Sequence, residues 1–199
     1  MLGKNLKKLP IGCFDYCNSL TEITLPDTLT TIDNGCFVGC ESLTKVTCGK
    51  NNKLGSGVFK GCKNLSTVIL PETLTRISDE TFADCANLTD ITIPESVTSI
   101  SDYAFQNCSK ISTLKIPDNL KYLGSSAFEG CSNLTSLSFG SKLQSVGIGP
   151  FADCPKLLEI SIDMPMEELR DLAYDFERDI SVKSSLKRII CRDGVLDLK

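Results

Sequence analysis

The sequence of 199 residues predicts an α/β solenoid, a stack of similar coils that share one core. Three observations lead to this fold class. One pattern of residue types recurs about every 23 positions along the chain. Within each unit, alternating apolar residues indicate a strand, and polar residues further along are typical of the start of a helical turn. We therefore predict one strand and one short helical turn per coil.

The repeat is clearest in two columns, a cysteine and the phenylalanine three positions before it. Seven of the eleven cysteines and seven of the nine phenylalanines stand in these columns. The cysteines are Cys17, Cys40, Cys62, Cys85, Cys108, Cys131 and Cys154. The phenylalanines are Phe14, Phe37, Phe59, Phe82, Phe105, Phe128 and Phe151. We interpret both columns as core positions, where cysteine acts as a small apolar filler.

A strand pattern follows each cysteine, as the coil that starts at residue 85 illustrates. Leu88 comes first, and the apolar residues Ile91 and Ile93 then alternate with polar ones. Pro94 ends the run, because proline lacks the N–H that a strand ladder requires. Side chains alternate across a strand, so the residues between the apolar ones should point outward.

The second half of each coil returns the chain to the core. Val97 and Ile100 supply apolar contacts there. The stretches 78–82 and 101–105 then place a serine and an acidic residue where a helical turn would begin. A serine satisfies free N–H groups, and an acidic side chain suits the positive end of a helix. These stretches are the predicted helical turns.

The repeat resembles the leucine-rich repeat of the BspA-like type. The family pattern Leu-x-x-Ile-x-Ile-Pro, Val-x-x-Ile and Ala-Phe-x-x-Cys is matched almost position by position by residues 88–108, and the resemblance covers residues 2–162. It implies a right-handed leucine-rich-repeat solenoid with a parallel sheet on the concave side. It also implies cell-surface adhesion and host or matrix binding, as in the bacteria and protists that carry the family. The expected location is then the cell surface or outside the cell.

We expect two regions in the chain. Residues 1–163 should form the solenoid, with a partial first coil and then coils that start at residues 17, 40, 62, 85, 108, 131 and 154. Residues 164–199 should form a C-terminal cap of one helix and a hairpin. Pro165 and apolar residues at helical spacing up to Phe176 indicate the helix. Asp193 and Gly194, between two apolar runs, indicate the hairpin turn.

The chain starts in the middle of a repeat. Leu2 and Leu6 align with Leu25 and Leu29, and no polar cap precedes them. An open solenoid end exposes apolar surface and a strand edge, so either upstream repeats or a partner should cover it. The start has no apolar stretch of the kind that a secretory signal contains. Free cysteines are compatible with an intracellular site, so the compartment stays open.

Composition argues against several classes of function. The net charge is −4 with lysines scattered among acids, which argues against nucleic acid as a partner. No apolar run approaches the ~18 residues of a membrane span. The chain has no histidine, and it has no phosphate-binding loop or nucleophile motif. We therefore expect no enzyme activity and no cofactor.

Two close cysteine pairs, Cys13 with Cys17 and Cys36 with Cys40, invite a zinc interpretation. Cys13 and Cys36 stand, however, in a column of small residues. Elsewhere that column holds Val58, Thr81, Ala104, Ala127 and Pro150. Small residues in a small-residue column favour packing over metal binding, so we expect no metal site.

The outward side of the predicted strands is the candidate binding surface. It is rich in Thr and Ser, sparsely charged and free of large aromatic residues, and such residues also suit any exposed strand. The interpretation is a non-catalytic, adhesin-like interaction module that binds a protein or glycan on its concave face. The candidate residues are Thr47, Thr67, Ile69, Asp90, Thr92, Thr113, Lys115, Ser136 and Ser138.

An alternative function is a structural scaffold inside a larger intracellular or virion assembly, which would use the ends and edges of the solenoid. Residues 40–61 are one residue shorter than the other coils and form a polar bulge before Leu54. We place Asn51 in the column of Leu29 here. The candidate contact residues of the bulge are Lys50, Asn52 and Lys53.

Overall fold

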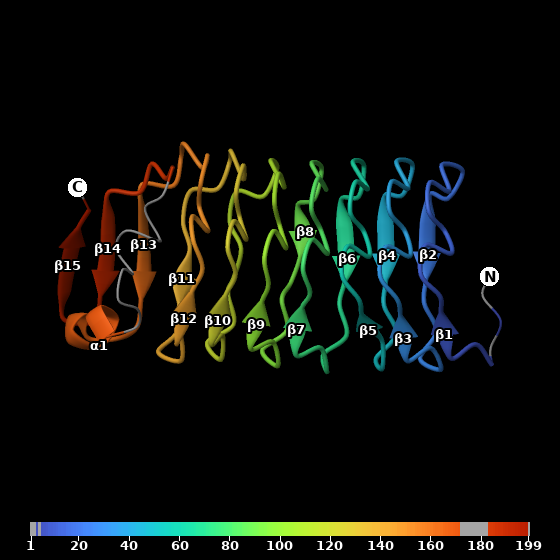
Figure 1. Ribbon diagram of the computed structural model, residues 1–199, viewed down its shortest axis with the longest axis horizontal. Helices are drawn as coiled ribbons and strands as arrows, with labels where there is room; N and C mark the ends of the chain where they lie inside the picture. Colours follow the sequence, from blue (N-terminus) through green and yellow to red (C-terminus); the bar gives the residue numbers. More distant parts are fainter. Residues whose placement is uncertain (1–2, 4, 172–182, 199) are drawn as a thin grey trace.

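The computed structural model describes residue 3 and residues 5–171 and 183–198. The chain forms a parallel-stranded solenoid of about seven turns, which confirms the predicted architecture. Figure 1 shows the coils side by side in sequence order along the long axis, with the first and last coils at opposite ends. Leu2 and Phe176 lie outside the described residues.

Each regular coil contributes to two rows of short strands on opposite parts of the coil (Figure 1). The first row begins with β2 (Glu22–Thr24), β4 (Lys45–Thr47), β6 (Thr67–Ile69) and β8 (Asp90–Ile91). The second row comprises β1 (Lys8–Leu9), β3 (Thr31–Ile32), β5 (Lys53–Leu54), β7 (Arg76–Ile77), β9 (Ser99–Ile100), β10 (Tyr122–Leu123) and β12 (Ser145–Val146). Sequence reasoning expected the first row but treated the second only as a return to the core.

The C-terminal part contains β11 (Ser138–Phe139), β13 (Glu159–Ile162), α1 (Met166–Asp171), β14 (Arg188–Cys191) and β15 (Gly194–Asp197). β14 continues the sheet in parallel beside β13, and β15 then pairs with β14 in the antiparallel direction. The Asp193 carboxylate accepts a hydrogen bond from the Met166 N–H at 2.8 Å, which links the hairpin turn to the start of α1.

The predicted helical turn in each coil is wrong. Residues 102–107 form consecutive turns, and Tyr103 and Asn107 each have a φ of 57°. Residues in this left-handed region interrupt a right-handed helix. The N–H of Phe105 donates to the carbonyl of Ala127 in the next coil at 2.8 Å, whereas in a helix it would bond within its own segment. Hydrogen bonding between coils therefore replaces the helix.

The phenylalanine column forms a continuous stack. From Phe14 to Phe151, neighbouring ring centroids lie 5.1–6.1 Å apart with nearly parallel planes. The rings from Phe37 onward are fully buried. Offset contacts of this kind add to the free energy that burial alone supplies.

The cysteine column is more than the predicted filler. From Cys40 to Cys154, each thiol donates to the carbonyl of the phenylalanine one coil earlier, at 3.0–3.2 Å. A valine or alanine would fit the space but would leave that buried carbonyl without this donor. Burial raises the pKa of Cys154 to about 11, so this thiol stays neutral at physiological pH.

The short coil breaks the second row of strands. β5 ends one sheet and β7 begins another. The first row continues through the same coil, because Lys45 still pairs with Thr67 although only 22 residues separate them. The missing residue therefore lies after the first strand of the coil.

Asn52, predicted as part of the exposed bulge, is buried with 1% of its surface exposed. The structure shows that Asn52, rather than Asn51, stands in the column of Leu29. Its side-chain nitrogen donates to the Leu29 carbonyl at 2.6 Å, and its side-chain oxygen accepts from the Gly49 N–H at 2.8 Å. The amide thus satisfies backbone groups inside the coil and is unavailable to a partner.

Replacing Phe105 with Ala should destabilise the chain by about 3–5 kcal/mol, because the substitution removes a buried ring and leaves a cavity. Thr92→Ala, on the exposed side of the strand row, should cost only about 0.5 kcal/mol or less. Urea unfolding of the two variants measures both values. Equal losses would show that the inward and outward sides of the coil are assigned wrongly.

Asn52→Ala should cost about 1–3 kcal/mol for each backbone group that it leaves buried without a partner. The matched control is Asn51→Ala, because the Asn51 side chain is exposed and donates once, to Asp27. Thermal unfolding of both variants tests the difference. A loss at Asn51 as large as that at Asn52 would contradict the structural role of Asn52.

Candidate functional site

The candidate residues of the strand row lie on one surface, as their alternation predicts. We define the strand face as the outward side of the first row, from β2 through β8 and on to residues 113–115 and 136–138. Within it, Lys45, Thr67 and Asp90 stand in register across three neighbouring strands. Thr113 and Ser136 continue this line as a parallel bridge. The intervening residues, such as Val46 and Val68, are buried.

Exposure differs among the candidate residues. Ile69 is the apolar exception, with 50% of its surface exposed. Thr47 and Thr67 are half-buried. The remaining candidates are exposed, and they are Asp90, Thr92, Thr113, Lys115, Ser136 and Ser138.

A shallow pocket of about 240 Å³ opens around Ile69. Four candidate residues line it, namely Ile69, Asp90, Thr92 and Lys115. Thr47, Thr67, Thr113, Ser136 and Ser138 lie on the same face but not in this pocket. The structure therefore brings the central candidates together and leaves the others as surrounding surface.

The pocket carries more negative than positive charge. Lys115 Nζ lies 2.6 Å from a Glu95 carboxylate oxygen, and the other oxygen of Glu95 accepts from the Asp118 N–H at 3.3 Å. The hydrogen bond from Lys115 lowers the pKa of Glu95, and the same bond raises the pKa of Lys115. Glu72 and Asp90 also line the pocket. Three carboxylate side chains and one ammonium group thus line the pocket.

Sequence reasoning missed Glu72 and Glu95, because it read each strand-ending proline only as a stop. The residue directly after that proline is acidic in four coils. These acidic residues are Asp27, Glu72, Glu95 and Asp118, and all four are exposed. Counting one further column of the repeat would have identified this acidic edge beside the strand face.

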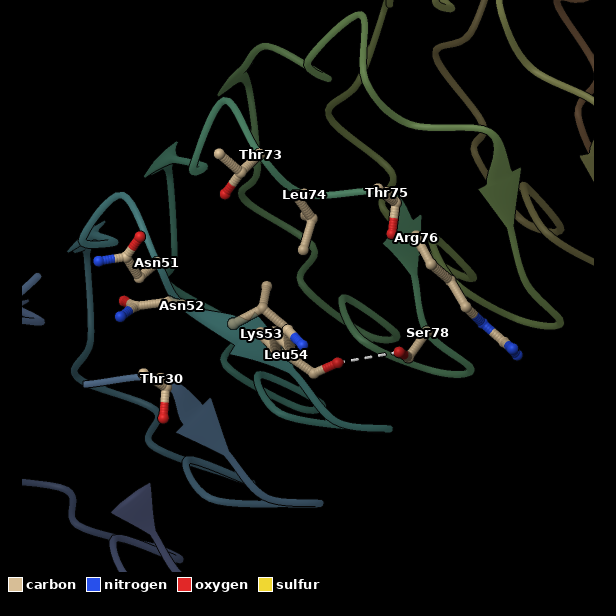
Figure 2. Close-up of a pocket in the computed structure, with 10 residues that line it drawn as sticks. All are labelled: Thr30, Asn51, Asn52, Lys53, Leu54, Thr73, Leu74, Thr75, Arg76 and Ser78. Carbon is tan, nitrogen blue, oxygen red and sulfur yellow. Dashed lines mark hydrogen bonds between the residues drawn. The ribbon is translucent and has the colours of Figure 1, made fainter. Parts of the chain in front are cut away.

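A second, larger pocket of about 720 Å³ lies where the second row breaks between β5 and β7 (Figure 2). The Ser78 hydroxyl donates to the Leu54 carbonyl at 2.9 Å across this break, as the dashed line in Figure 2 shows. Figure 2 also shows the Arg76 guanidinium pointing away from Leu54. Arg76 donates instead to the Ser101 hydroxyl at 2.8 Å.

Of the three bulge candidates, only Lys53 is both exposed and part of this second pocket. Lys50 is exposed outside the lining, where its N–H donates to the Asp27 carboxylate at 2.9 Å. Asn52 lines the inner wall, with its amide bonded to the backbone as described above. The bulge is therefore a smaller surface than the sequence suggested.

The close cysteine pairs are not arranged as a metal site. Cys13 faces Cys36 of the next coil, with 3.1 Å between the sulfur atoms, while Cys40 donates to the Phe14 carbonyl. Across residues 5–171 and 183–198, no group of three or more His, Cys, Asp or Glu side chains could hold a metal ion. No helix in these same ranges has the length and apolar character needed to cross a membrane.

Comparison with solved structures places the fold among bacterial leucine-rich repeat proteins. A leucine-rich repeat protein of T. pallidum is 27% identical over 85% of this chain and 78% of its own, with a TM-score of 0.72. A leucine-rich repeat protein of Bacteroides ovatus is 18% identical over 93% of this chain and 64% of its own, with a TM-score of 0.52. No curated protein matches the chain.

The family model of the BspA type leucine rich repeat region matches in six copies, over residues 1–79 and 52–181. Leucine-rich repeat proteins generally bind proteins and generally lack enzyme activity. The repeat columns, the stacked coils and this match agree, and the chain belongs to the BspA type leucine-rich repeat family.

Proposed function

We propose that this chain is a non-catalytic, adhesin-like module that binds a protein partner through the strand face, centred on the Ile69 pocket. The half-exposed Ile69 side chain carries the proposal, because it is a large apolar residue surrounded by hydroxyl and charged groups. Apolar anchors ringed by polar residues are typical of protein-binding surfaces. The family resemblance implies that this face is the concave side of the solenoid.

The charge of the pocket favours a particular partner chemistry. Glu72, Asp90 and Glu95 exceed the positive charge of Lys115, and Glu95 already pairs with that lysine. A partner segment with an apolar side chain between Lys or Arg residues would fill the space beside Ile69 and meet the carboxylates. Because these groups are exposed, water and salt screen them, so charge would contribute mainly to specificity and association rate.

The remaining strand face supplies area. Neighbouring strands lie ~4.8 Å apart, so seven coils span about 30 Å and offer the ~800 Å² per partner of a standard interface. The exposed tyrosines Tyr16, Tyr103 and Tyr122 are not among the residues of the strand face. A sugar ring commonly packs on such aromatic side chains, so a glycan partner is the less favoured alternative.

A second candidate function is the structural scaffold, which would use ends and edges. Two observations favour it. Ile11 and Tyr16 in the first coil are 73% and 65% exposed, and the pocket at the β5–β7 break presents Lys53 at an interrupted sheet. In this function, the partner contacts the first coil and the bulge and leaves the strand face free.

Selection of random peptides displayed on phage against the immobilised chain would distinguish these functions. We expect enriched peptides with an apolar residue flanked by Lys or Arg. Their binding to an Ile69→Lys, Thr92→Lys variant, measured by fluorescence anisotropy, should be at least about tenfold weaker, a loss of ~1.4 kcal/mol. Both substituted side chains are exposed, so circular dichroism of the variant should match that of the parent chain.

The matched control is Lys50→Glu with Lys53→Glu, which changes the charge of the bulge and leaves the strand face unchanged. This control should bind the selected peptides within about twofold of the parent chain. Loss of binding in the control alone would support the scaffold function. If no peptide is enriched and the chain instead binds glycans on an array, the proposal of a protein partner is overturned.

A further inference from the structure

Two cysteines of neighbouring coils face each other near the start of the solenoid. Cys13 and Cys36 occupy the same column, and their sulfur atoms lie 3.1 Å apart. In the later coils this column holds no cysteine. Its residues there are Val58, Thr81, Ala104, Ala127 and Pro150. The paired thiols are therefore confined to the first two positions of the column.

The backbone holds these two residues in register. The N–H of Phe14 donates to the carbonyl of Cys36 at 2.8 Å, and the N–H of Gly12 donates to the carbonyl of Asn34 at 3.2 Å. Chains joined by such a ladder lie ~4.8 Å apart, inside the range of about 4.4–6.8 Å that a disulfide requires between its Cα atoms. A bond of ~2.05 Å would need the sulfur atoms to approach by about 1 Å.

The other column of cysteines is arranged differently. From Cys40 to Cys154, each thiol donates to a phenylalanine carbonyl in the preceding coil. The Cys36 sulfur is instead paired with the Cys13 sulfur. The Cys40 and Cys62 side chains also interact with each other, but both of these thiols donate to phenylalanine carbonyls. The thiols of Cys13 and Cys36 thus face each other as a disulfide would require.

We propose that Cys13 and Cys36 form a redox site, in which a low-molecular-weight disulfide such as oxidised glutathione converts the two thiols into an intrachain disulfide. Cys13 is exposed and meets the oxidant, whereas Cys36 is buried behind it. The product joins the first coil to the second.

The reaction balances in two exchange steps. The Cys13 thiolate attacks one sulfur of oxidised glutathione, which forms a mixed disulfide and releases one glutathione that takes up the thiol proton. The Cys36 sulfur then attacks the Cys13 sulfur, the bond to glutathione breaks, and the second glutathione leaves with the Cys36 proton. Two protein thiols are oxidised, and one glutathione disulfide is reduced to two thiols.

The environment of the two sulfurs fixes the order of these steps. Burial and the neighbouring Cys13 thiol raise the pKa of Cys36, so Cys36 is protonated in the reduced chain. The exposed Cys13 is therefore the sulfur that reacts with the external disulfide. Cys36 acts second, as the resolving thiol.

Oxidation would strengthen a part of the solenoid whose core residues are only partly buried. Phe14, Cys17, Leu20 and Ile23 are only partly buried, whereas their equivalents in the later coils are buried. A covalent link between residues 13 and 36 limits how far this first coil can open. The redox state would thus set the local stability of the first coil.

The full chain should be incubated with oxidised glutathione under native conditions, then unfolded and alkylated. We expect nine of the eleven cysteines to remain free. Cleavage after Glu22 separates Cys13 from Cys36, so mass spectrometry should find the two peptides joined. Amide hydrogen exchange in residues 11–20 should slow severalfold and recover when the disulfide is reduced.

Three variants complete the test. Ala104 and Ala127 stand in the same column as Cys13 and Cys36, which indicates that alanine fits at these positions. Cys36→Ala should stop at the glutathione adduct on Cys13, and Cys13→Ala should yield neither adduct nor disulfide. Cys17→Ala, the matched control, should still form the disulfide. Eleven free thiols in the oxidised parent chain, or a disulfide that joins another pair, would overturn the proposal. Unchanged hydrogen exchange in the oxidised chain would overturn its effect on the first coil.

Discussion

The stacking of identical core positions from coil to coil is the interaction on which the rest of the structure depends. The phenylalanine rings follow one another at 5.1–6.1 Å, and from Cys40 to Cys154 each cysteine thiol donates to the carbonyl of the phenylalanine one coil earlier. Ring contact and sulfur hydrogen bond both act between neighbours, so each coil is positioned by the next. Each coil must therefore place the same residue types at the stacked positions, which is why the sequence repeats about every 23 residues.

The same constraint arranges the surface. Once the inward columns are in register, the outward ones must align too, which is why Thr67 and Asp90 stand side by side on the strand face. The short coil shows how far the constraint reaches. Its missing residue interrupts the second row between β5 and β7. The strands β4 and β6 remain paired, because the core positions before the missing residue keep their alignment with the next coil.

The columns of recurring residue types predicted the solenoid, the strands and the exposed face. They did so because positions that are buried once per coil require apolar residues at a regular spacing. Hydrogen bonds between coils are harder to predict, because backbone groups form most of them and every residue type carries such groups. The stretch 101–105 has the polar residues of a helix start, but the N–H groups of Tyr103 and Phe105 donate to carbonyls of the next coil. Asn52 is a polar residue at a core position. The sequence pattern therefore assigned its column to Asn51, one residue too early. The pairing of Lys115 with Glu95 depends on neighbouring coils, which a single coil's sequence does not display.

A double-mutant cycle on the phenylalanine stack measures whether contacts between neighbouring coils hold the solenoid in register. Phe82 and Phe105, whose centroids are 5.3 Å apart, should show a coupling energy of about 0.5–1.5 kcal/mol when replaced by Ala singly and together. Phe37 and Phe128, which are separated by three other rings of the stack, should be additive within ~0.5 kcal/mol. Additive losses at Phe82 and Phe105, or equal coupling in both pairs, would contradict a solenoid held in register by contacts between neighbouring coils.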